Sequence, residues 1–177
     1  GERNRIATTR IWGVGRGRRV HGVGAVEIVV VVVVVVVALL QKLRIDNNTF
    51  VVFTSDHGYH LGEHFMWGKV TLFEECARVP LIVRVPGVSP AGAISNGLVE
   101  TIGLFRTLAE LCRLPSPVYL QGKSYAGLIR KPNSLADASA YTVVSRGTQL
   151  GRSIRTKRLR STGEGFTERR GHMGYPV

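Results

Sequence analysis

Two side chains that could hold a cation, Asp56 and His57, are adjacent in the sequence. They follow an apolar run that ends at Phe53, and Gly58 comes directly after them. A carboxylate can bind a hard cation such as Ca²⁺ or Mg²⁺, and a neutral imidazole nitrogen can add a further ligand. An Asp at the end of a strand is more often a cap or a turn residue, so the pair alone is weak evidence for a metal site.

An alternation of strands and helices is expected to position this pair. Residues 49–53 are β-branched or aromatic without alternation, as in a parallel strand that is covered on both faces. Residues 70–77 fit a short helix, and residues 81–85 fit a second strand. Apolar side chains at three- and four-residue steps predict an amphipathic helix that ends near Leu114. Its apolar stripe consists of Leu98, Ile102, Phe105, Leu108, Ala109 and Cys112. This order predicts an α/β domain with a largely parallel sheet.

Composition divides the chain into three segments. Residues 1–37 are rich in Arg and Gly and end in nine consecutive valines, and we interpret them as a low-complexity or unreliable segment. Residues 38–132 hold the predicted α/β domain. Residues 133–177 are predicted to form a partly irregular C-terminal subdomain, in which 141–145 and 153–159 could be short antiparallel strands.

The apolar run from Ile28 to Leu40 is too short for a stable membrane span. It has thirteen residues, whereas a helix that crosses a bilayer needs about twenty. Basic residues ahead of an apolar core do imitate a secretory signal, but no small-x-small cleavage site follows here. A signal or anchor segment is therefore the less favoured interpretation of this run.

The formal net charge of +12 comes from the two ends of the chain. Residues 1–19 carry a net charge of +5 and residues 146–177 carry +6, so the sequence between them is nearly neutral. A candidate basic face for nucleic acid consists of Arg152, Arg155, Lys157, Arg158 and Arg160. Neither a recognised binding fold nor an aromatic stacking platform accompanies it, so a nucleic-acid partner is not predicted.

The order of motifs across residues 54–82 resembles that of the sulfatases, which belong to the alkaline-phosphatase superfamily. The motifs are Thr-Ser-Asp-His-Gly, Leu-Gly-Glu-His, Trp-Gly-Lys, Leu-Phe-Glu-Glu and Arg-Val-Pro-Leu-Ile. Together they are far more specific than any one of them, and the resemblance is strongest to the iduronate-2-sulfatase-like branch. It covers roughly residues 38–160. It implies a C-terminal fragment with a partial alkaline-phosphatase-like sandwich, a mostly parallel sheet and a small C-terminal antiparallel hairpin.

The resemblance implies roles for particular residues in a metal and sulfate site. Asp56 and His57 would be two ligands of one divalent cation, normally Ca²⁺, with Mg²⁺ as the alternative. Lys69 would contact a sulfate oxygen and neutralise charge as the S–O bond breaks, unless it is simply an exposed loop lysine. His60 and Trp67 would contact the substrate, a sulfate ester such as a sulfated carbohydrate; ordinary surface exposure and loop packing are the simpler alternatives.

Other polar side chains of the loop are weaker candidates. His64 could contact substrate or act as a general acid, although loop histidines are more often surface residues. Glu63, Glu74 and Glu75 show no pairing that would support acid–base catalysis, and we expect them to be solvated or paired with Arg78. Cys76 and Cys112 lack metal-binding spacing and are interpreted as buried free thiols, with a disulfide between them as the alternative.

The nucleophile that the resemblance requires is not in this sequence. Sulfatases use a formylglycine made from the first residue of a Cys- or Ser-x-Pro-x-Arg motif, and no such motif occurs here. The resemblance places that group and the remaining metal ligands in an N-terminal half. Two ligands cannot complete a calcium site of about six to eight ligands, so we expect the chain alone to be inactive.

Alternative functions stay open at this stage. A phosphodiester or phosphonate hydrolase of the same superfamily would use the same metal scaffold on a different anion. A non-catalytic remnant would keep the fold without the chemistry. The location of the protein is not readable from these residues, although the family suggests an exported, periplasmic or lysosomal one.

Overall fold

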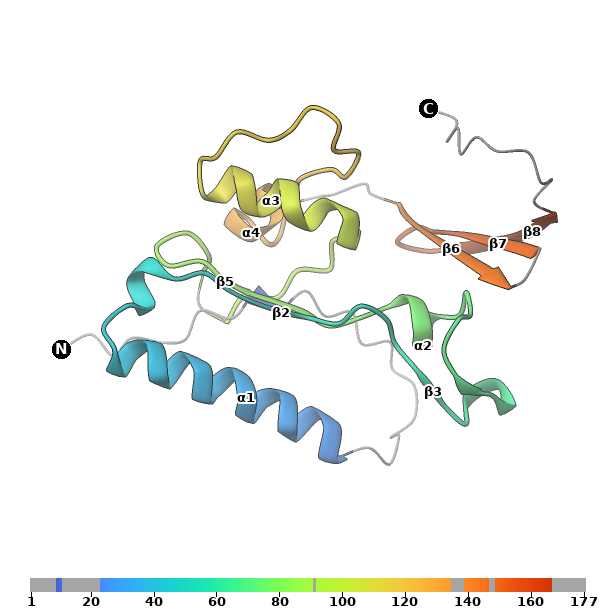
Figure 1. Ribbon diagram of the computed structural model, residues 1–177, viewed down its shortest axis with the longest axis horizontal. Helices are drawn as coiled ribbons and strands as arrows, with labels where there is room; N and C mark the ends of the chain where they lie inside the picture. Colours follow the sequence, from blue (N-terminus) through green and yellow to red (C-terminus); the bar gives the residue numbers. More distant parts are fainter. Residues whose placement is uncertain (1–8, 11–22, 91, 135–138, 147–148, 167–177) are drawn as a thin grey trace. The chain divides into compact units, whose positions relative to one another are not determined.

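A computed structural model of the chain describes residues 9–10, 23–90, 92–134, 139–146 and 149–166 (Figure 1). The chain divides into two compact units. The first consists of Gly1–Asp56 and Val79–Ala138, and the second of His57–Arg78 and Ser139–Val177. In the predicted low-complexity segment 1–37, residues 1–8 and 11–22 lie outside the described residues. In the predicted C-terminal subdomain 133–177, the last described residue is Phe166.

The sheet of the first unit has the strand order β1-β5-β2. Its strands are β1 (Thr9–Arg10), β2 (Val51–Thr54) and β5 (Leu81–Arg84). β5 pairs antiparallel with both neighbours, and Val52 of β2 lies opposite Val83 of β5. The α/β class is confirmed, but the prediction of a largely parallel sheet is wrong for these described strands.

The connection between β2 and β5 explains the antiparallel pairing. Parallel neighbours need a crossover, usually a helix that carries the chain back to the starting edge. The intervening residues contain instead the two-stranded ladder of β3 (His60–Leu61) and β4 (Trp67–Gly68), a 3₁₀ turn (Glu63–Phe65) and the four-residue helix α2 (Glu74–Ala77). The predicted helix over 70–77 is therefore shorter than expected. All four β2 residues are partly buried, a pattern that indicates cover on both faces without fixing the direction of pairing.

The valine tract lies in a 20-residue helix, α1 (Val23–Lys42). Figure 1 shows α1 along one side of the β2–β5 pair, with α3 (Leu104–Leu111) and α4 (Ala126–Arg130) along the other. Val37 is buried, whereas Val34 and Val35 are 47% and 49% exposed, so only one stripe of this part of the helix is covered. Among the described helices, none is long and apolar enough to cross a membrane.

The core of the first unit lies between β5 and the helices α3 and α4. Its buried side chains are Leu81, Val83, Val85, Tyr125, Leu128 and Ile129. Leu81 and Val83 of β5 are buried, while Ile82 and Arg84 between them are only partly buried, as the alternation of a strand requires. Burial raises the pKa of Tyr125 to about 12.

The predicted helix over 98–112 begins later than expected, and part of its predicted buried stripe is exposed. A 3₁₀ turn (Thr101–Gly103) precedes α3. Three members of the predicted buried stripe are exposed, namely Ile102, Phe105 and Cys112, whereas Ala109 is buried as predicted. The prediction of a buried Cys112 is therefore wrong. Leu104, Thr107 and Leu111 face the core instead, and they have helical spacing too, so periodicity alone could not choose between the two faces.

The buried hydroxyl of Thr107 joins α3 to the start of α4. It donates to the Gly103 carbonyl at 2.7 Å and accepts the Tyr125 N–H at 3.0 Å. Thr107→Val leaves that N–H without its acceptor, so we expect the free energy of unfolding to fall by about 1–3 kcal/mol in chemical denaturation. Thr107→Ser keeps the hydroxyl, so its free energy of unfolding is expected to fall clearly less. An equal fall in both variants would show that the hydroxyl does not stabilise this contact.

The second unit contains an antiparallel sheet of strand order β6-β7-β8. Its strands are β6 (Ala140–Arg146), β7 (Gln149–Arg155) and β8 (Arg160–Phe166). The predicted C-terminal antiparallel hairpin is confirmed, and a third strand extends it. The strand predicted over 153–159 is misplaced, since β7 ends at Arg155 and a turn follows it. A Cβ placed on Gly151 of β7 would lie 3.0 Å from the Leu72 side chain, so the segment that carries Leu72 packs closely on this sheet.

Candidate functional site

His57 and Lys69, two of the predicted site residues, lie in direct contact. The Nε2 atom of His57 is 2.9 Å from the Lys69 Nζ, although the residues are 12 positions apart. The other ring nitrogen, Nδ1, lies 2.9 Å from the Gly58 carbonyl oxygen. Asp56 precedes His57 shortly after β2, and one of its carboxylate oxygens accepts the Ser55 hydroxyl at 3.4 Å.

These contacts define which ring nitrogen of His57 carries hydrogen. A carbonyl only accepts hydrogen bonds, so Nδ1–H donates to Gly58. An ammonium only donates, so the Nε2 lone pair accepts from Lys69. A neutral imidazole that presents its Nε2 lone pair to a cation is also the form that binds metal ions. The chemistry of the ring therefore suits the predicted ligand role.

Gly58 allows the turn at His57 to pack directly on α2. Its N–H donates to the Cys76 carbonyl at 2.9 Å. A Cβ at this position would lie only 1.8 Å from the Glu75 carbonyl oxygen, far inside van der Waals contact. The close approach of the two backbones therefore requires glycine.

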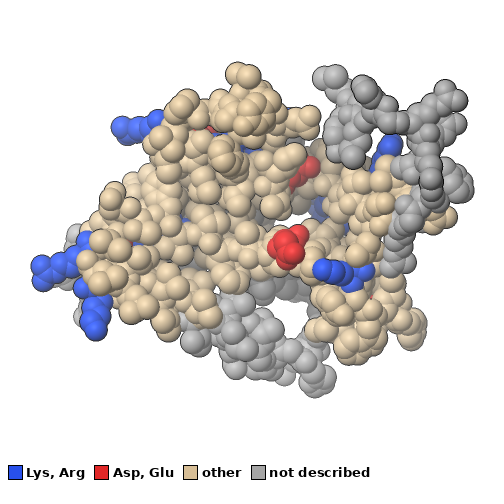
Figure 2. Space-filling model, viewed as in Figure 1, with Lys and Arg blue, Asp and Glu red and all other residues tan. Residues whose placement is uncertain are grey.

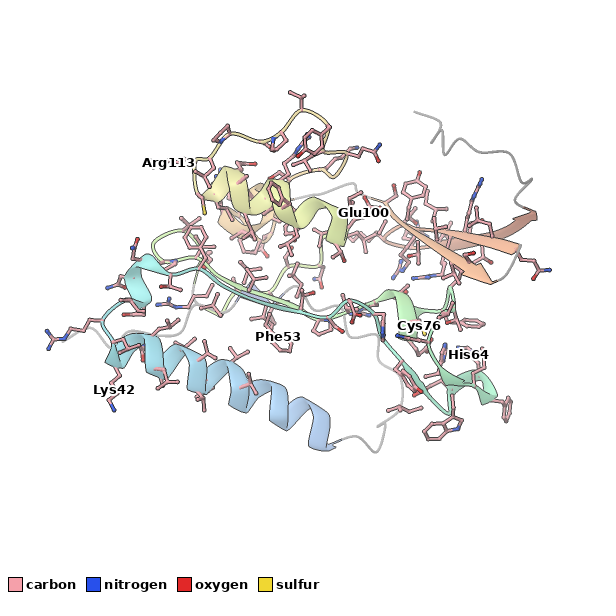
Figure 3. The ribbon with its side chains drawn as sticks, viewed as in Figure 1. Lys42, Phe53, His64, Cys76, Glu100 and Arg113 are labelled. Atoms are coloured by element: carbon pink, nitrogen blue, oxygen red, sulfur yellow. The ribbon has the colours of Figure 1, made fainter. Side chains whose placement is uncertain are left out.

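The side chain of Cys76 connects α2 to the other member of the pair. Cys76 is buried, as predicted, and its Sγ lies 3.8 Å from the Gly68 carbonyl oxygen, one residue before Lys69. Figure 3 shows Cys76 on α2. The short helix thus contacts the backbone next to His57 through its main chain and the backbone next to Lys69 through a thiol.

His60 lies inside the loop, with no exposed surface. Its Nε2 is 2.8 Å from the Thr71 hydroxyl, and its Nδ1 has no hydrogen-bond partner within the described part of the chain. Its ring meets His64 and Phe73 edge-on, and His64 stacks on Phe73 with 4.1 Å between ring centroids (His64 is labelled in Figure 3). This position supports the loop from within, and the predicted contact of His60 with substrate stays a prediction.

Trp67 lies at the exposed end of the same loop. Its side chain is 75% exposed, and Phe65 nearby is fully exposed. The indole ring covers Gly62, where an added Cβ would lie 3.8 Å from the nearest ring atom. An exposed indole suits the predicted wall of a substrate pocket, and that role also stays a prediction.

Backbone strain marks the loop around these residues. His64, Phe65 and Val70 have φ values of 55°, 56° and 68°, in the left-handed region that favours glycine. Each such residue costs about 1–3 kcal/mol and persists only where its surroundings hold it, most often at functional sites. Val70, which is β-branched, directly follows Lys69, so one strained position adjoins the predicted sulfate contact.

Glu63 and Glu75 of the loop have different surroundings. The Leu61 N–H donates to Glu63 at 2.7 Å, and this backbone hydrogen bond is the main cause that lowers the pKa of the Glu63 carboxyl. Glu75 lies 3.6 Å from the His64 Nε2. A carboxylate with a lowered pKa is a poor proton donor near neutral pH, so Glu63 does not suit the role of general acid.

Glu74 makes contacts that local sequence could not indicate. It pairs with Arg78 at 3.7 Å, as predicted, but also with Arg155 at 3.5 Å and with Arg160. Because Arg160 is 86 positions away, no spacing rule connects it to Glu74. These contacts occupy two arginines of the candidate basic face, and Figure 2 shows Lys and Arg only in separate places on the visible side.

The described residues contain no group of three or more His, Cys, Asp or Glu that could hold a metal ion. They offer Asp56 and His57 as neighbouring candidates on one chain segment. These two side chains do not make a complete metal site by themselves.

Comparison with known proteins identifies the segment that carries all of the predicted site residues. The family model for sulfatases matches residues 29–114. Mouse (Mus musculus) iduronate 2-sulfatase is 39% identical over 102 residues, an alignment that covers 44% of this chain. Residues 29–114 are therefore similar to a sulfatase domain. This matched segment contains the His57–Lys69 contact and α2.

Two further relatives extend the similarity. An extracellular sulfatase SULF-1 homolog of Drosophila melanogaster is 37% identical over 95 residues, which cover 53% of this chain. A protein solved in complex with its substrate D-glucosamine-2-N,6-O-disulfate superposes with a TM-score of 0.65 and 26% identity over 74% of this chain. The chain spans 18% of the mouse enzyme, 8% of the Drosophila protein and 30% of the solved chain.

Proposed function

We propose that this chain supplies part of the divalent-metal and sulfate site of a sulfuric ester hydrolase. The observation that carries the proposal is the contact of His57 with Lys69 at 2.9 Å within a segment of the sulfatase family. A phosphodiester or phosphonate hydrolase is not favoured, because the matching family model and these curated relatives are sulfatases.

Asp56 and His57 would hold one divalent cation, Ca²⁺ in the first place and Mg²⁺ as the alternative. The carboxylate of Asp56 is a hard oxygen ligand, and His57 has an Nε2 lone pair directed at a cationic group. Calcium takes about six to eight ligands, so groups other than these two must complete the site. When bound, such a cation stabilises negative charge on the oxygens of an ester.

Lys69 would bind a sulfate oxygen through its ammonium group. A compact cation held near the ester neutralises the charge that develops as the S–O bond breaks. The acceptor that Lys69 now has, the Nε2 of His57, is neutral, and a sulfate oxygen is a stronger acceptor for an ammonium group. The formylglycine nucleophile would have to come from outside these 177 residues, because they contain no Cys- or Ser-x-Pro-x-Arg motif.

A sulfated carbohydrate is the substrate that we propose. One structural relative was solved with a disulfated glucosamine, and the mouse relative is an iduronate sulfatase. The exposed indole of Trp67 offers a flat apolar surface against which a sugar ring could pack. One relative is named an extracellular sulfatase, and we extend an exported location to this protein at that coarse level.

Loss of the Lys69 charge is expected to weaken sulfate binding by roughly tenfold, because a hydrogen bond to a charged group is lost. Isothermal titration calorimetry of the 177-residue chain with sodium sulfate, in the presence of Ca²⁺, measures this for Lys69→Gln. Lys157→Gln is the matched control, since Lys157 is exposed between β7 and β8. If Lys69→Gln and the wild type bind sulfate with equal affinity, Lys69 does not contact sulfate and the proposed role is wrong.

A further inference from the structure

Arg160 holds the start of α2 on the C-terminal sheet. Its guanidinium donates to the Leu72 carbonyl and to a carboxylate oxygen of Glu74, and its side chain is only 20% exposed. The planar guanidinium can reach a backbone and a side-chain acceptor at the same time, which the ammonium of a lysine does less well. Arg160 therefore fixes both the position and the orientation of the residues that lead into α2.

Glu74 is also the carboxylate that allows two arginines to share one face of the sheet. Arg155 and Arg160 lie directly opposite each other on β7 and β8, and like charges in that position destabilise a sheet. The same Glu74 oxygen contacts both guanidinium groups, with Arg155 Nε at 3.5 Å. Arg78 approaches its second oxygen at 3.7 Å. The charge of Glu74 thus offsets the repulsion between these two arginines, and its attraction to both of them holds the start of α2 on the sheet.

A short series of contacts connects Glu74 to the His57–Lys69 contact. Glu74 is the first residue of α2, and Cys76 lies two residues later. The Cys76 carbonyl accepts the Gly58 N–H at 2.9 Å, and the Gly58 carbonyl lies 2.9 Å from the His57 Nδ1. Any shift of α2 therefore moves the group that orients the His57 ring.

We propose that Glu74 and Arg160 are positioning residues that set His57 against Lys69 through α2. The roles of His57 and Lys69 rest on the proposed function, but the contact between them can be observed without metal or sulfate. The contact of Glu74 with Arg160 explains how β8, far along the chain, can hold a loop in place whose own strands and helix are only two to four residues long.

Glu74→Gln and Arg160→Gln test the proposal in the full chain. Amide hydrogen exchange at Gly58 is expected to accelerate roughly tenfold or more relative to the β6–β7 amides, because the acceptor on α2 is no longer held in place. The ring ¹⁵N shifts of His57, which report its two hydrogen-bond partners, are expected to change as well. Arg158→Gln is the control and should change neither readout, since Arg158 is exposed in the turn between β7 and β8.

Unchanged Gly58 exchange and unchanged His57 shifts in either folded variant would overturn the proposal. Arg160→Gln could also make the β7 amides exchange faster, because Arg160 belongs to the sheet. In that case the result for Glu74→Gln is the one that tests the proposal, because Glu74 lies outside the sheet. Loss of protection throughout the β6–β7 ladder in both variants would overturn the proposal too, since the role of the two residues would then be general stability of the sheet. Gly58 exchange and the His57 shifts are measured without metal or sulfate. Failure of the chain to bind sulfate would therefore count against the proposed function without affecting this test.

Discussion

Gly58→Ala is expected to separate His57 from Lys69 and to destabilise the second unit by about 3 kcal/mol or more, at the upper end for overpacking. The new methyl group would lie 1.8 Å from the Glu75 carbonyl oxygen, which belongs to backbone and cannot rotate away. Relief requires the turn to move off α2, and this breaks the hydrogen bond from Gly58 to Cys76. The Gly58 carbonyl that orients the His57 ring is then displaced with the turn, and the ring moves relative to Lys69.

Gly163→Ala is the matched control for this change. Gly163 lies in β8 of the same unit, and no heavy atom is within 4 Å of the position of its Cβ. Chemical denaturation measures the stability of both variants, and ring ¹⁵N shifts report His57. Similar small losses for the two substitutions, with the His57 shifts unchanged in Gly58→Ala, would contradict the close packing of this turn on α2.

A second large effect is expected in the first unit, at the ion pair of Asp46 and Arg84. Their side chains are only 8% and 12% exposed, and Arg84 Nη2 lies 3.0 Å from the Asp46 carboxylate. Arg84 also donates to the Asp46 carbonyl at 2.6 Å, so it joins the turn after α1 to β5. Arg84→Met leaves a buried carboxylate without its partner, which costs about 3–5 kcal/mol.

An exposed pair in the same unit provides the comparison. Arg130 lies 2.7 Å from Glu110, but the two side chains are 45% and 44% exposed. Arg130→Met should therefore lower the free energy of unfolding by less than about 1 kcal/mol. Denaturant unfolding followed at the β2–β5 amides measures both variants. If Arg84→Met costs no more than Arg130→Met, burial of the first pair is not what makes it important.

The contacts within the candidate site were predictable to the extent that they are local in sequence. His57 and Lys69 are 12 positions apart on one segment, so motif spacing could bring them together. The strands that flank this segment were also predicted nearly in place, as 49–53 and 81–85 against Val51–Thr54 and Leu81–Arg84. The antiparallel direction of their pairing was not predicted. An apolar run indicates that a strand is buried, but it does not indicate the path of the connection between two strands.

The contacts that hold the site in place depend on residues far apart in the sequence. Glu74 meets Arg160 across 86 positions, and nothing in the spacing of either residue indicates a partner. In α3 and the 3₁₀ turn before it, two sets of apolar side chains have helical spacing. Leu104 and Leu111 pack against the core, while Ile102 and Phe105 are exposed. Tertiary packing makes that choice, because both faces satisfy the same periodicity.

The most direct test of the proposed function is an NMR titration of the intact 177-residue chain, first with Ca²⁺ and then with sulfate. We predict that Ca²⁺ shifts the His57 Nε2 resonance and the Asp56 carboxylate, and that sulfate then shifts the Lys69 ammonium, all at roughly millimolar concentrations. Arg158, which is exposed in the turn between β7 and β8, should be unaffected. Shifts confined to exposed residues such as Arg158, with none at His57 or Lys69, would contradict a metal and sulfate site in this segment.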